Sequence, residues 1–425
     1  MTHIENIGGV MYNFIIIFNK IMLFLFLILY SYQIFYAIIG ALKKSKNFKT
    51  DVKNRYAVII SARNERVVIG QLLQSIKNQN YPSELIDIFV VADNCSDDTA
   101  QIAREAGAIV YERNNKKLVG KGYALDYIFK IIIRDYKEKE YKGYFIFDAD
   151  NILDNNYILE MNKVFNSGYK AVTSYRNSKN FNSNWISAGY ALWFLRESKY
   201  LNNSRMILNT SCSISGTGFL ISHEIIKKNN GWKYHLLTED LEFSMDIVLN
   251  NEKIGYCHKA KFYDEQPCTF RQSWNQRLRW SKGFYQVFMK DGWSLFINIF
   301  KNKSFSSFDM LMTIAPAMFI SLLGLLVNFT VFTISILNKT DMLLLYEATS
   351  SIIFTIFNYY LTLFAFGALT TITEWKEIRA TAFEKILYTF TFPLFIATYI
   401  PIAIVALFKK VEWKPIEHTI VIENT

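Results

Sequence analysis

Four long uncharged stretches limit what this chain can fold into. They cover residues 21–42, 310–337, 348–373 and 386–408. Each meets the requirement of roughly 20 apolar residues for a helix that crosses a bilayer. The chain as a whole is also apolar, since 51% of its residues are hydrophobic. The sequence therefore predicts a protein that lies partly in lipid.

The flanks of these stretches predict an orientation. The first stretch is longer than the apolar segment of a signal peptide and has no small-residue cleavage site, so we expect it to remain as an anchor. It is followed by Lys43, Lys44, Lys46 and Lys49. The positive-inside rule then places residues 43–309 in the cytoplasm of a multi-pass plasma-membrane protein, with the N-terminus outside. The last stretch contains Pro393 and Pro401, which predicts a broken re-entrant or interfacial element.

The net charge of +10 narrows the choice of partners. A basic excess is typical of proteins that bind nucleic acid, an anionic membrane face or a phosphorylated substrate. No basic stripe interleaved with stacking aromatic residues occurs outside the membrane-proximal segments, so no nucleic-acid partner is expected. Lysines beside the bilayer account for part of the charge.

Short apolar runs alternate with helical patterns between the first two stretches. The predicted strands are residues 56–60, 86–92 and 144–147, and two predicted helices are residues 67–78 and 99–106. This alternation is typical of an α/β domain with a mostly parallel sheet. Ligands of such sheets bind beyond the carboxyl ends of the strands, so residues at these ends are the first functional candidates.

Polar residues follow the first two predicted strands. The loop after the first strand supplies Ser61, Asn64 and Glu65. Asp93 stands at the last position of the second strand, where a carboxylate can accept an N–H from a bound base. We therefore expect a nucleobase at this edge of the sheet.

A pair of aspartates, Asp148 and Asp150, follows the third strand. Two carboxylates one residue apart after a buried strand can share a hard divalent cation and the phosphates of a substrate. Oxygen ligands favour Mg²⁺ or Mn²⁺ over zinc. Because such a pair also arises by chance in a chain with 37 acidic residues, a structural role is the alternative. The position at a strand end favours the cation.

Two later motifs carry further candidates. In Thr238-Glu239-Asp240, Thr238 or Asp240 can cap a helix, or Asp240 can act as a general base at the helix N-terminus. The motif Gln276-x-x-Arg279-Trp280 lies in an amphipathic stretch. That stretch is either only an interfacial helix, or it also places Arg279 on a pyrophosphate and Trp280 on a sugar ring.

The ordered set of these motifs resembles the family 2 processive glycosyltransferases, which include cellulose, hyaluronan, chitin and poly-N-acetylglucosamine synthases. The set consists of Asp93, Asp148-x-Asp150, Thr238-Glu239-Asp240 and Gln276-x-x-Arg279-Trp280. The resemblance covers residues 55–280, and the membrane stretches extend it. It implies a GT-A-like (Rossmann-like) α/β catalytic domain in the cytosol, joined to an α-helical transmembrane region with interfacial helices.

The resemblance also implies a task for each candidate residue. Asp240 is the implied catalytic base, and Asp148 and Asp150 are the implied ligands of Mg²⁺ or Mn²⁺. The residues implied to bind the nucleobase are Ser61, Asn64, Glu65 and Asp93, and those implied to bind phosphate are Lys121 and Asp148. Gly216 and Gly218 are implied to line the acceptor site, and Gln276, Arg279 and Trp280 to hold the acceptor sugar and the diphosphate. Glu239, next to Asp240, is a further implied substrate-binding residue.

The C-terminal segment, residues 409–425, carries a last feature of the resemblance. Relatives have a tryptophan-centred segment after the membrane elements, which lies over the bound nucleotide as a gate. Trp413 and His418 are the implied substrate contacts in this segment, beside Lys409 and Lys410. The alternative is a basic flank of the last membrane element followed by a solvated tail.

The implied function is an inverting, processive transferase that polymerises a UDP-sugar and secretes the chain across the membrane. UDP-glucose and a β-glucan are expected. The alternatives are a UDP-N-acetylglucosamine polymerase and a non-processive transferase that acts on a lipid. A membrane scaffold that binds no substrate is a further alternative, against which the intact aspartates argue.

Five regions follow from these features. They are an N-terminal transmembrane helix (1–42), a cytosolic transferase domain (43–270), amphipathic interfacial helices (271–309), a C-terminal membrane region (310–408) and a cytosolic tail (409–425). Four membrane elements are few for a closed channel around a growing polymer. A second copy of the chain or an accessory secretion subunit therefore stays open as a partner.

Overall fold

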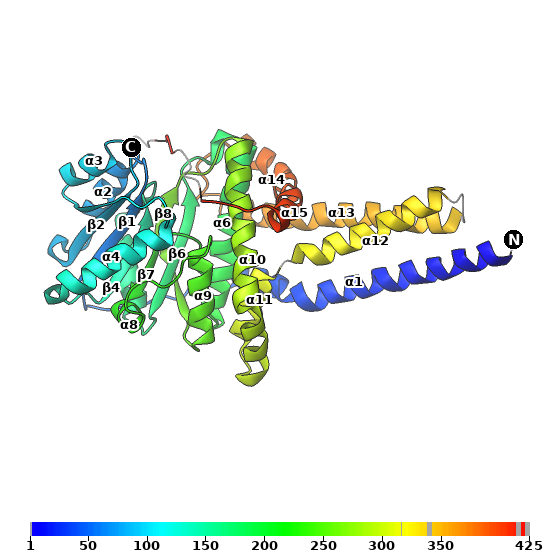
Figure 1. The fold of residues 1–425 in the computed structure, drawn as a ribbon, viewed down its shortest axis with the longest axis horizontal. Coiled ribbons are helices and arrows are strands. Elements are labelled where there is room, and N and C mark those ends of the chain that lie inside the picture. Colours follow the sequence, from blue (N-terminus) through cyan, green and yellow to red (C-terminus); the bar gives the residue numbers. More distant parts are fainter. Residues whose placement is uncertain (1, 316, 338–341, 414–417, 421–425) are drawn as a thin grey trace.

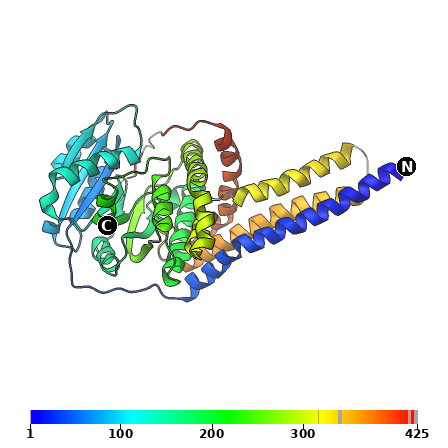
Figure 2. The ribbon, with the colours of Figure 1, turned by 60° about the horizontal axis from the view of Figure 1, so that its bottom comes forward.

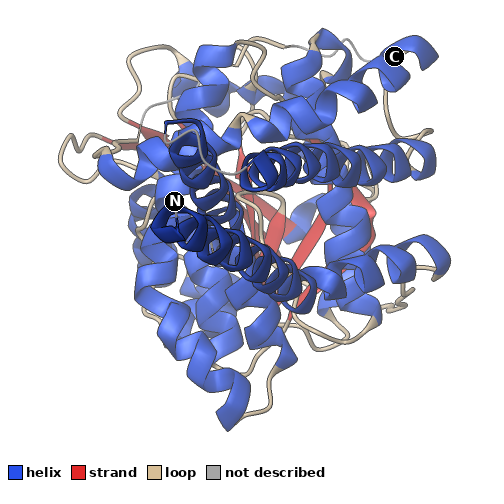
Figure 3. Ribbon diagram, turned by 90° about the vertical axis from the view of Figure 1, so that its right-hand side faces the viewer, coloured by secondary structure: helices blue, strands red, loops and turns tan. Residues whose placement is uncertain are grey.

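The computed structural model describes residues 2–315, 317–337, 342–413 and 418–420. Three helices project together from an α/β part (Figure 1): α1 (Thr2–Leu42), α12 (Ala317–Leu337) and α13 (Met342–Thr373). An extended connection, residues 43–55, runs from the base of α1 to the sheet (Figure 2). Viewed along the projecting helices, the sheet lies behind them and is surrounded by the remaining helices (Figure 3).

The α/β part is built on one eight-stranded sheet. In spatial order its strands are β3 (Ile109–Arg113), β2 (Ile86–Asp93), β1 (Tyr56–Ala62), β4 (Gly143–Asp148), β7 (Phe219–Ser222), β6 (Ala171–Ser178), β8 (Ile254–Asp264) and β5 (Ile152–Leu153). The first four strands are parallel, as expected. The other half is mixed, because β7 runs antiparallel to β4 and β6, and β5 runs antiparallel to β8. The expectation of a mostly parallel sheet therefore holds for one half of it.

Apolar periodicity explains how the helices cover this sheet. In α2 (Ile69–Lys77) the buried side chains are Ile69, Leu72, Leu73 and Ile76, which share one helix face. The other helices of the α/β part are α3 (Thr99–Glu105), α4 (Lys121–Asp135), α5 (Tyr157–Phe165), α6 (Trp185–Arg196), α7 (Asn203–Ile207), α8 (His223–Lys228) and α9 (Glu239–Leu249). A π-helical segment, Glu197–Asn202, joins α6 to α7.

Four helices lie at the base of the projecting helices: α10 (Phe270–Lys301), α11 (Phe305–Ile314), α14 (Ala382–Ala397) and α15 (Tyr399–Phe408). Helix α10 runs across the direction of α1, α12 and α13 (Figure 1). Its second half exposes Met289, Trp293 and Phe300. An exposed apolar stripe on such a helix is typical of a helix that rests on a bilayer surface.

Among the described residues, three helices are long and apolar enough to cross a membrane: Val10–Leu42, Met342–Thr373 and Ala382–Phe408. The stretch 310–337, expected as one span, is instead divided between α11 and α12. Helix α11 ends at Ile314, and Ala315 takes an extended conformation (φ −66°, ψ 131°). Ala315 precedes a proline in the sequence, and a residue before proline is disfavoured in a helix.

The last apolar stretch is interrupted, as its prolines predicted. Helix α14 ends at Ala397 and α15 begins at Tyr399, so that Pro401 lies in the first turn of α15, where a missing N–H costs little. Of this candidate span, 33% is buried within the protein, against 6% for each of the other two. Helix α14 packs on α6 and α15 packs on α10. Helices α14 and α15 are therefore apolar and also pack against the rest of the protein.

Candidate active site

The carboxyl ends of β1, β2 and β4 bring the predicted residues to one edge of the sheet. Ser61 pairs with Asp148 across β1 and β4. The strand β1 continues to Ala62, so Ser61 belongs to the strand and not to the loop predicted for it. The loop itself is held to the neighbouring strand end, because the Asn64 side-chain amide donates to Ser96 Oγ at 3.1 Å.

Asp93 lies at the end of β2 and is almost fully buried. Arg113, the last residue of β3, donates to Asp93 Oδ1 at 2.5 Å, and Asn94 donates to the same oxygen at 3.0 Å. Burial raises the pKa of Asp93, and the hydrogen bond and charge of Arg113 oppose that rise. Both hydrogen bonds are accepted by Oδ1. A carboxylate held through one oxygen in this way can accept a hydrogen bond from a ligand with its other oxygen.

Lys121, at the start of α4, bridges two parts of the edge. Its Nζ donates to Asp148 Oδ1 at 2.5 Å and to the backbone carbonyl of Gly216 at 2.7 Å. The Asp148 amide in turn donates to Thr217 Oγ1 at 2.8 Å. The predicted phosphate-binding lysine, the first aspartate of the pair and the 215–218 loop therefore form one connected group.

Asp150 belongs to a second acidic group, which the C-terminal tail completes. The Glu265 amide donates to Asp150 Oδ2 at 2.9 Å, and His418 Nε2 lies 4.0 Å from the same oxygen. The other nitrogen of this imidazole, Nδ1, lies 2.9 Å from Glu65 Oε2. Burial alone would lower the pKa of His418, but Asp150 and Glu65 raise it to about 10.

Further tail contacts lie beside His418. The amides of Thr419 and Ile420 donate to the Glu265 carboxylate at 3.0 and 2.9 Å. The Arg63 guanidinium lies 5.2 Å from the centre of the Trp413 ring. Both predicted tail residues therefore lie against the strand-end loops. The rest of the predicted tail, residues 414–417 and 421–425, lies outside the described residues.

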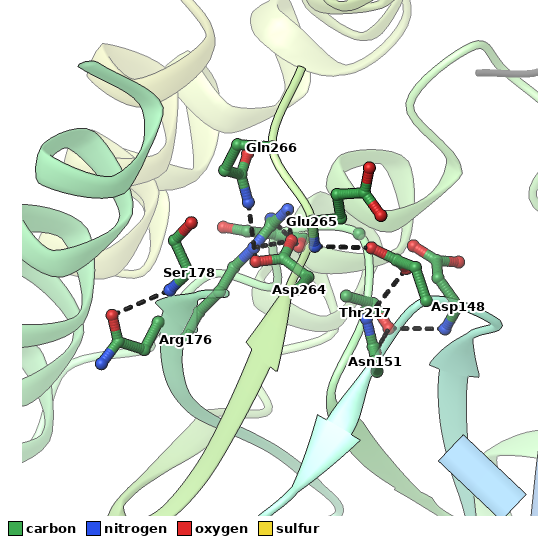
Figure 4. A network of polar contacts seen from close by, with 12 residues as sticks. Asp148, Asn151, Arg176, Ser178, Thr217, Asp264, Glu265 and Gln266 are labelled. Carbon is green, nitrogen blue, oxygen red and sulfur yellow. Dashed lines mark hydrogen bonds and ion pairs between the residues drawn. The ribbon is translucent and has the colours of Figure 1, made fainter. Parts of the chain in front are cut away.

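The end of β8 joins these groups through a network of polar contacts (Figure 4). Arg176 Nε donates to Asp264 Oδ2 at 2.8 Å, and its Nη1 donates to the Ser215 carbonyl at 2.9 Å. Thr217 Oγ1 donates to Asn151 Oδ1 at 2.6 Å. The ends of β4, β6 and β8 and the 215–218 loop thus share one polar layer.

The chemistry of Asp148 and Asp150 fits a divalent cation in part. Both side chains are hard oxygen donors at the end of a strand. Within the described residues no three acidic, histidine or cysteine side chains form a complete ligand set. Two carboxylates are enough for Mg²⁺ or Mn²⁺ when substrate phosphates and water provide the other ligands. The donor set therefore fits a cation bound together with a diphosphate.

Asp240 lies in the first turn of α9, where its Oδ2 accepts from the Gly216 amide at 2.6 Å. Burial raises its pKa, while the amides of Leu241 and Gly216 and the charge of Lys121 oppose the rise. Burial and then Asp240 raise the pKa of the adjacent Glu239. Thr238 is the N-cap residue, yet its side chain makes no capping hydrogen bond. The Asp240 carboxylate is therefore held by a backbone amide.

The motif Gln276-x-x-Arg279-Trp280 lies on α10, which packs against α9. Arg279 Nη1 reaches the Leu237 carbonyl at 3.5 Å, three residues before Asp240. Trp280 contacts the rings of Tyr190 and Phe194 edge to face, at 5.7 and 6.1 Å between ring centres. Buried Gln276 Oε1 has no hydrogen-bond partner among the described residues. An unpaired buried oxygen can still accept a hydrogen bond from a water or a ligand.

Gly218 is closely packed. It is buried with φ +68°, and a Cβ at this position would lie 2.3 Å from the Phe262 ring. Glycine is therefore required here by packing, and the acceptor contact implied for Gly218 stays a prediction. Gly216, with φ +79°, has open space where a Cβ would point, which agrees with a position beside a ligand.

Several residues of this edge were not predicted. Lys179, just after β6, is buried, and its Nζ has no partner among the described residues. Asp264 and Glu265 stand at the end of β8. The rule that functional candidates stand at the carboxyl ends of strands would have predicted all three residues, because each one ends or follows a strand. They were missed because the sequence did not identify β6 and β8 as strands.

Comparison with known proteins identifies relatives of this chain. A β-monoglucosyldiacylglycerol synthase of Trichormus variabilis is 24% identical over 270 residues, which cover 60% of this chain and 54% of that protein. A poly-β-1,6-N-acetyl-D-glucosamine synthase of Staphylococcus epidermidis is 25% identical over 292 residues, 66% of each protein. The chain thus spans about half to two thirds of the length of the curated relatives it matches.

A solved mannosyltransferase of Pyrobaculum calidifontis, in complex with GDP-mannose and Mn²⁺, has the same fold. It superposes with a TM-score of 0.54 at 15% identity, over 92% of this chain and 99% of that protein. The α/β part is therefore GT-A-like, as expected. The model of glycosyltransferase-like family 2 matches residues 54–283, more than half of the chain. The chain belongs to this family and is a glycosyltransferase.

Proposed function

We propose that this protein is an inverting, processive polymerase that takes a UDP-sugar from the cytoplasm and extends a glycan at the membrane. UDP-glucose is the expected donor and a β-glucan the expected product. The observation that carries the proposal is the position of Asp240. Its carboxylate is held at 2.6 Å by Gly216, whose carbonyl is held by the same lysine that pairs with Asp148. The 215–218 loop thus contacts both the proposed base, Asp240, and Lys121 of the proposed diphosphate site.

The proposed reaction is a single in-line displacement. Asp240 takes the proton of the acceptor hydroxyl, and the hydroxyl oxygen attacks the anomeric carbon as the bond to UDP breaks. Because the donor is α-linked, one displacement gives a β-linked product. Lys121 and Arg279 face the departing diphosphate with positive charge. A divalent cation held by Asp148 and Asp150 would supply further charge to the diphosphate when bound.

The nucleobase and the acceptor are assigned to opposite ends of this edge. Asp93, fixed by Arg113, accepts from the uracil, with the loop of Asn64 and Glu65 beside it. Trp280 presents a ring to the acceptor sugar, and Gln276 Oε1 accepts from one of its hydroxyls. Sugars pack their apolar face on aromatic rings, so this arrangement suits a carbohydrate acceptor.

The tail contacts support a membrane arrangement with the catalytic domain inside the cell. Since His418 contacts Glu65, the tail and the α/β part lie on the same side of the membrane. In the proposed arrangement α1 and α13 cross the bilayer together with α12, whose apolar part, Leu322–Leu337, is shorter. Helices α14 and α15, which are together long and apolar enough to cross, instead stay at the inner face beside α10. This agrees with the lysines that follow α1 and with the exposed stripe on α10.

Cysteine labelling in intact cells tests this arrangement. Thr425→Cys should be protected from a membrane-impermeant maleimide until the cells are opened. Thr340→Cys, in the short connection between α12 and α13, is the matched control and should label from outside. Labelling of Thr425→Cys in intact cells would overturn the arrangement.

A second candidate function is transfer of a single sugar to a lipid. The similarity to β-monoglucosyldiacylglycerol synthases favours it, because those relatives are named for a glycolipid product. Helices α10 and α15 meet beside the Gln276–Trp280 motif, so a lipid acceptor would have a short path from the bilayer to Asp240.

The function is tested by UDP release from the full chain in nanodiscs with Mn²⁺ or Mg²⁺. The donor panel contains UDP-glucose, UDP-N-acetylglucosamine, UDP-glucuronate and UDP-galactose, and each product is sized and digested with linkage-specific hydrolases. A long β-glucan from UDP-glucose supports the proposal. A polymer made from UDP-N-acetylglucosamine would make that nucleotide sugar, and not UDP-glucose, the donor. A single-sugar lipid product would favour the second candidate. No turnover with any donor, with or without added lipid, would contradict both.

A further inference from the structure

The 215–218 loop touches a carboxylate that the proposed reaction does not use. Glu197 begins the π-helical segment after α6, and its Oε1 accepts from Ser215 Oγ. On the other side of the same residue, Arg176 Nη1 donates to the Ser215 carbonyl at 2.9 Å. Ser215 is thus held through both its side chain and its backbone.

The next residue of the loop, Gly216, contacts the proposed base, Asp240. The Gly216 amide, which shares a peptide bond with the Ser215 carbonyl, donates to Asp240 Oδ2 at 2.6 Å. The Gly216 carbonyl accepts from Lys121 at 2.7 Å. Because a peptide unit is planar, Arg176 fixes the direction of the same unit that points its N–H at Asp240. A rotation of Ser215 would therefore move that N–H.

We propose that Glu197 is a positioning residue for Asp240, which acts with Arg176 by clamping Ser215 so that the Gly216 amide holds the base toward the acceptor. The inference rests on the proposed function, in which Asp240 is the general base.

The surroundings of Glu197 favour this task over a direct contact with substrate. A cavity of about 10 Å³ beside Arg176, Glu197 and Ser215 has room for one water at most. Arg176 is itself fixed, since Asp264 accepts from its Nε at 2.8 Å and its guanidinium lies 3.4 Å from the centre of the Phe194 ring. Glu197 therefore acts from behind the loop.

The π-helical segment agrees with a functional position for Glu197. Single π turns inside helices are rare and frequently occur at functional sites. Here the irregular segment begins at Glu197, the residue that reaches the loop. Glu197 itself keeps α-helical backbone angles (φ −61°, ψ −47°), so its side chain extends toward Ser215 from the regular end of α6.

The test compares kcat, KM and UDP binding for variants of the clamp in the full chain in nanodiscs, with UDP-glucose and Mn²⁺. Glu197→Ala and Ser215→Ala should each lower kcat roughly 10- to 100-fold, since small errors in the placement of a base are costly. The donor KM and the Kd of UDP should stay within about twofold of wild type. Glu197→Gln keeps an acceptor oxygen for Ser215 Oγ and should recover most of kcat.

The double variant Glu197→Ala/Ser215→Ala measures whether the two residues act as one unit. We expect it to lose little more than the worse single variant, because both changes break the same clamp. Glu374→Ala is the matched control: Glu374 is a buried carboxylate that accepts from the Tyr175 hydroxyl and pairs with Lys199, and within the described part of the chain it forms no hydrogen bond or ion pair with the 215–218 loop. Its loss should lower thermal stability without a selective loss of kcat.

Three results would overturn the inference: full kcat in Glu197→Ala, an equal fall in UDP binding, or losses that multiply in the double variant. If Glu197→Ala does not fold, Ser215→Ala decides alone, and an unchanged kcat in that variant has the same meaning. Asp240→Asn is measured in parallel. If it is inactive while Glu197→Ala is fully active, only the present inference fails; if Asp240→Asn is active, the proposed function fails as well.

Discussion

Two acidic groups on the same sheet edge are held in different ways. Asp240 is fixed from within the α/β part, by the Gly216 amide and the charge of Lys121. Asp150 is fixed by the Glu265 amide but also faces His418, which comes from the tail beyond the last apolar helix. The base is thus part of a closed scaffold, whereas the aspartate assigned to the cation depends on a segment that has to return from the membrane.

This difference suggests a division of labour. In the proposed mechanism, the groups that perform the bond exchange lie on the strand ends and in the first turn of α9. Some of the groups proposed to meet the nucleotide and the cation, Glu65 and Asp150, also contact the tail that follows α15. Changes to the first group should therefore affect kcat, and changes to the second should affect binding of donor and cation.

The largest expected effect is that of Asp240→Asn. The amide keeps the shape of the side chain but cannot take a proton, so kcat should fall by about 10²- to 10⁴-fold. UDP binding, measured by calorimetry with Mn²⁺, should stay near the wild-type value. The exposed Asp135→Asn serves as the control. Polymer synthesis at the wild-type rate in Asp240→Asn would show that Asp240 is not the base.

Asp150→Asn should have the next largest effect. Loss of one carboxylate from the proposed cation site should raise the Mn²⁺ concentration needed for half-maximal UDP release by at least about tenfold, since the charge of the ligands sets the affinity for hard cations. Metal titrations of wild type, Asp148→Asn and Asp150→Asn measure this directly. An unchanged metal requirement in both variants would place the cation elsewhere.

His418→Ala should have a smaller effect, on the donor KM. The change removes the contact with Glu65 and leaves the amide contacts of Thr419 and Ile420 with Glu265, so the tail loses part of its anchorage. We expect the KM for UDP-glucose to rise roughly three- to tenfold, which corresponds to about one kcal/mol, with a smaller change in kcat. Glu412→Ala, an exposed change on the same tail, is the control. A selective fall in kcat would contradict the division of labour.

The smallest expected effect concerns pH. Burial raises the pKa of Asp240, so kcat should fall on the acidic side at a pH above the ordinary range of an aspartate, because the protonated carboxyl cannot act as a base. Glu239→Gln removes a neighbouring negative charge and should move this acidic limb to lower pH, by less than about one unit. A pH profile of kcat for both proteins tests this. A shift to higher pH would contradict the proposed coupling.

Much of this edge could be predicted because its residues belong to local patterns. Asp93 and Asp148 stand directly at the ends of short apolar strands, and the apolar stretches are long enough to be recognised by composition alone. The break in the last stretch follows from its prolines. Such features depend on a few neighbouring residues and need no knowledge of the packing.

Other residues could not be found in this way because tertiary contacts decide their position. Strand β8 contains His258, Lys259 and Lys261, which hide its strand pattern and with it Asp264 and Glu265 at its end. The close packing of Gly218 depends on the Phe262 ring, which β8 supplies and which no pattern around Gly218 indicates. Glu197 contacts Ser215, 18 residues later in the chain, only through the tertiary fold.

A single displacement at the anomeric carbon, with Asp240 as the base, fixes the configuration of the newly formed bond. The product made from α-linked UDP-glucose can be examined by NMR, where the coupling of the anomeric proton distinguishes the two configurations. We expect a β linkage in wild type and no new linkage in Asp240→Asn. An α linkage would require two displacements or a different geometry of attack, and would contradict a single displacement.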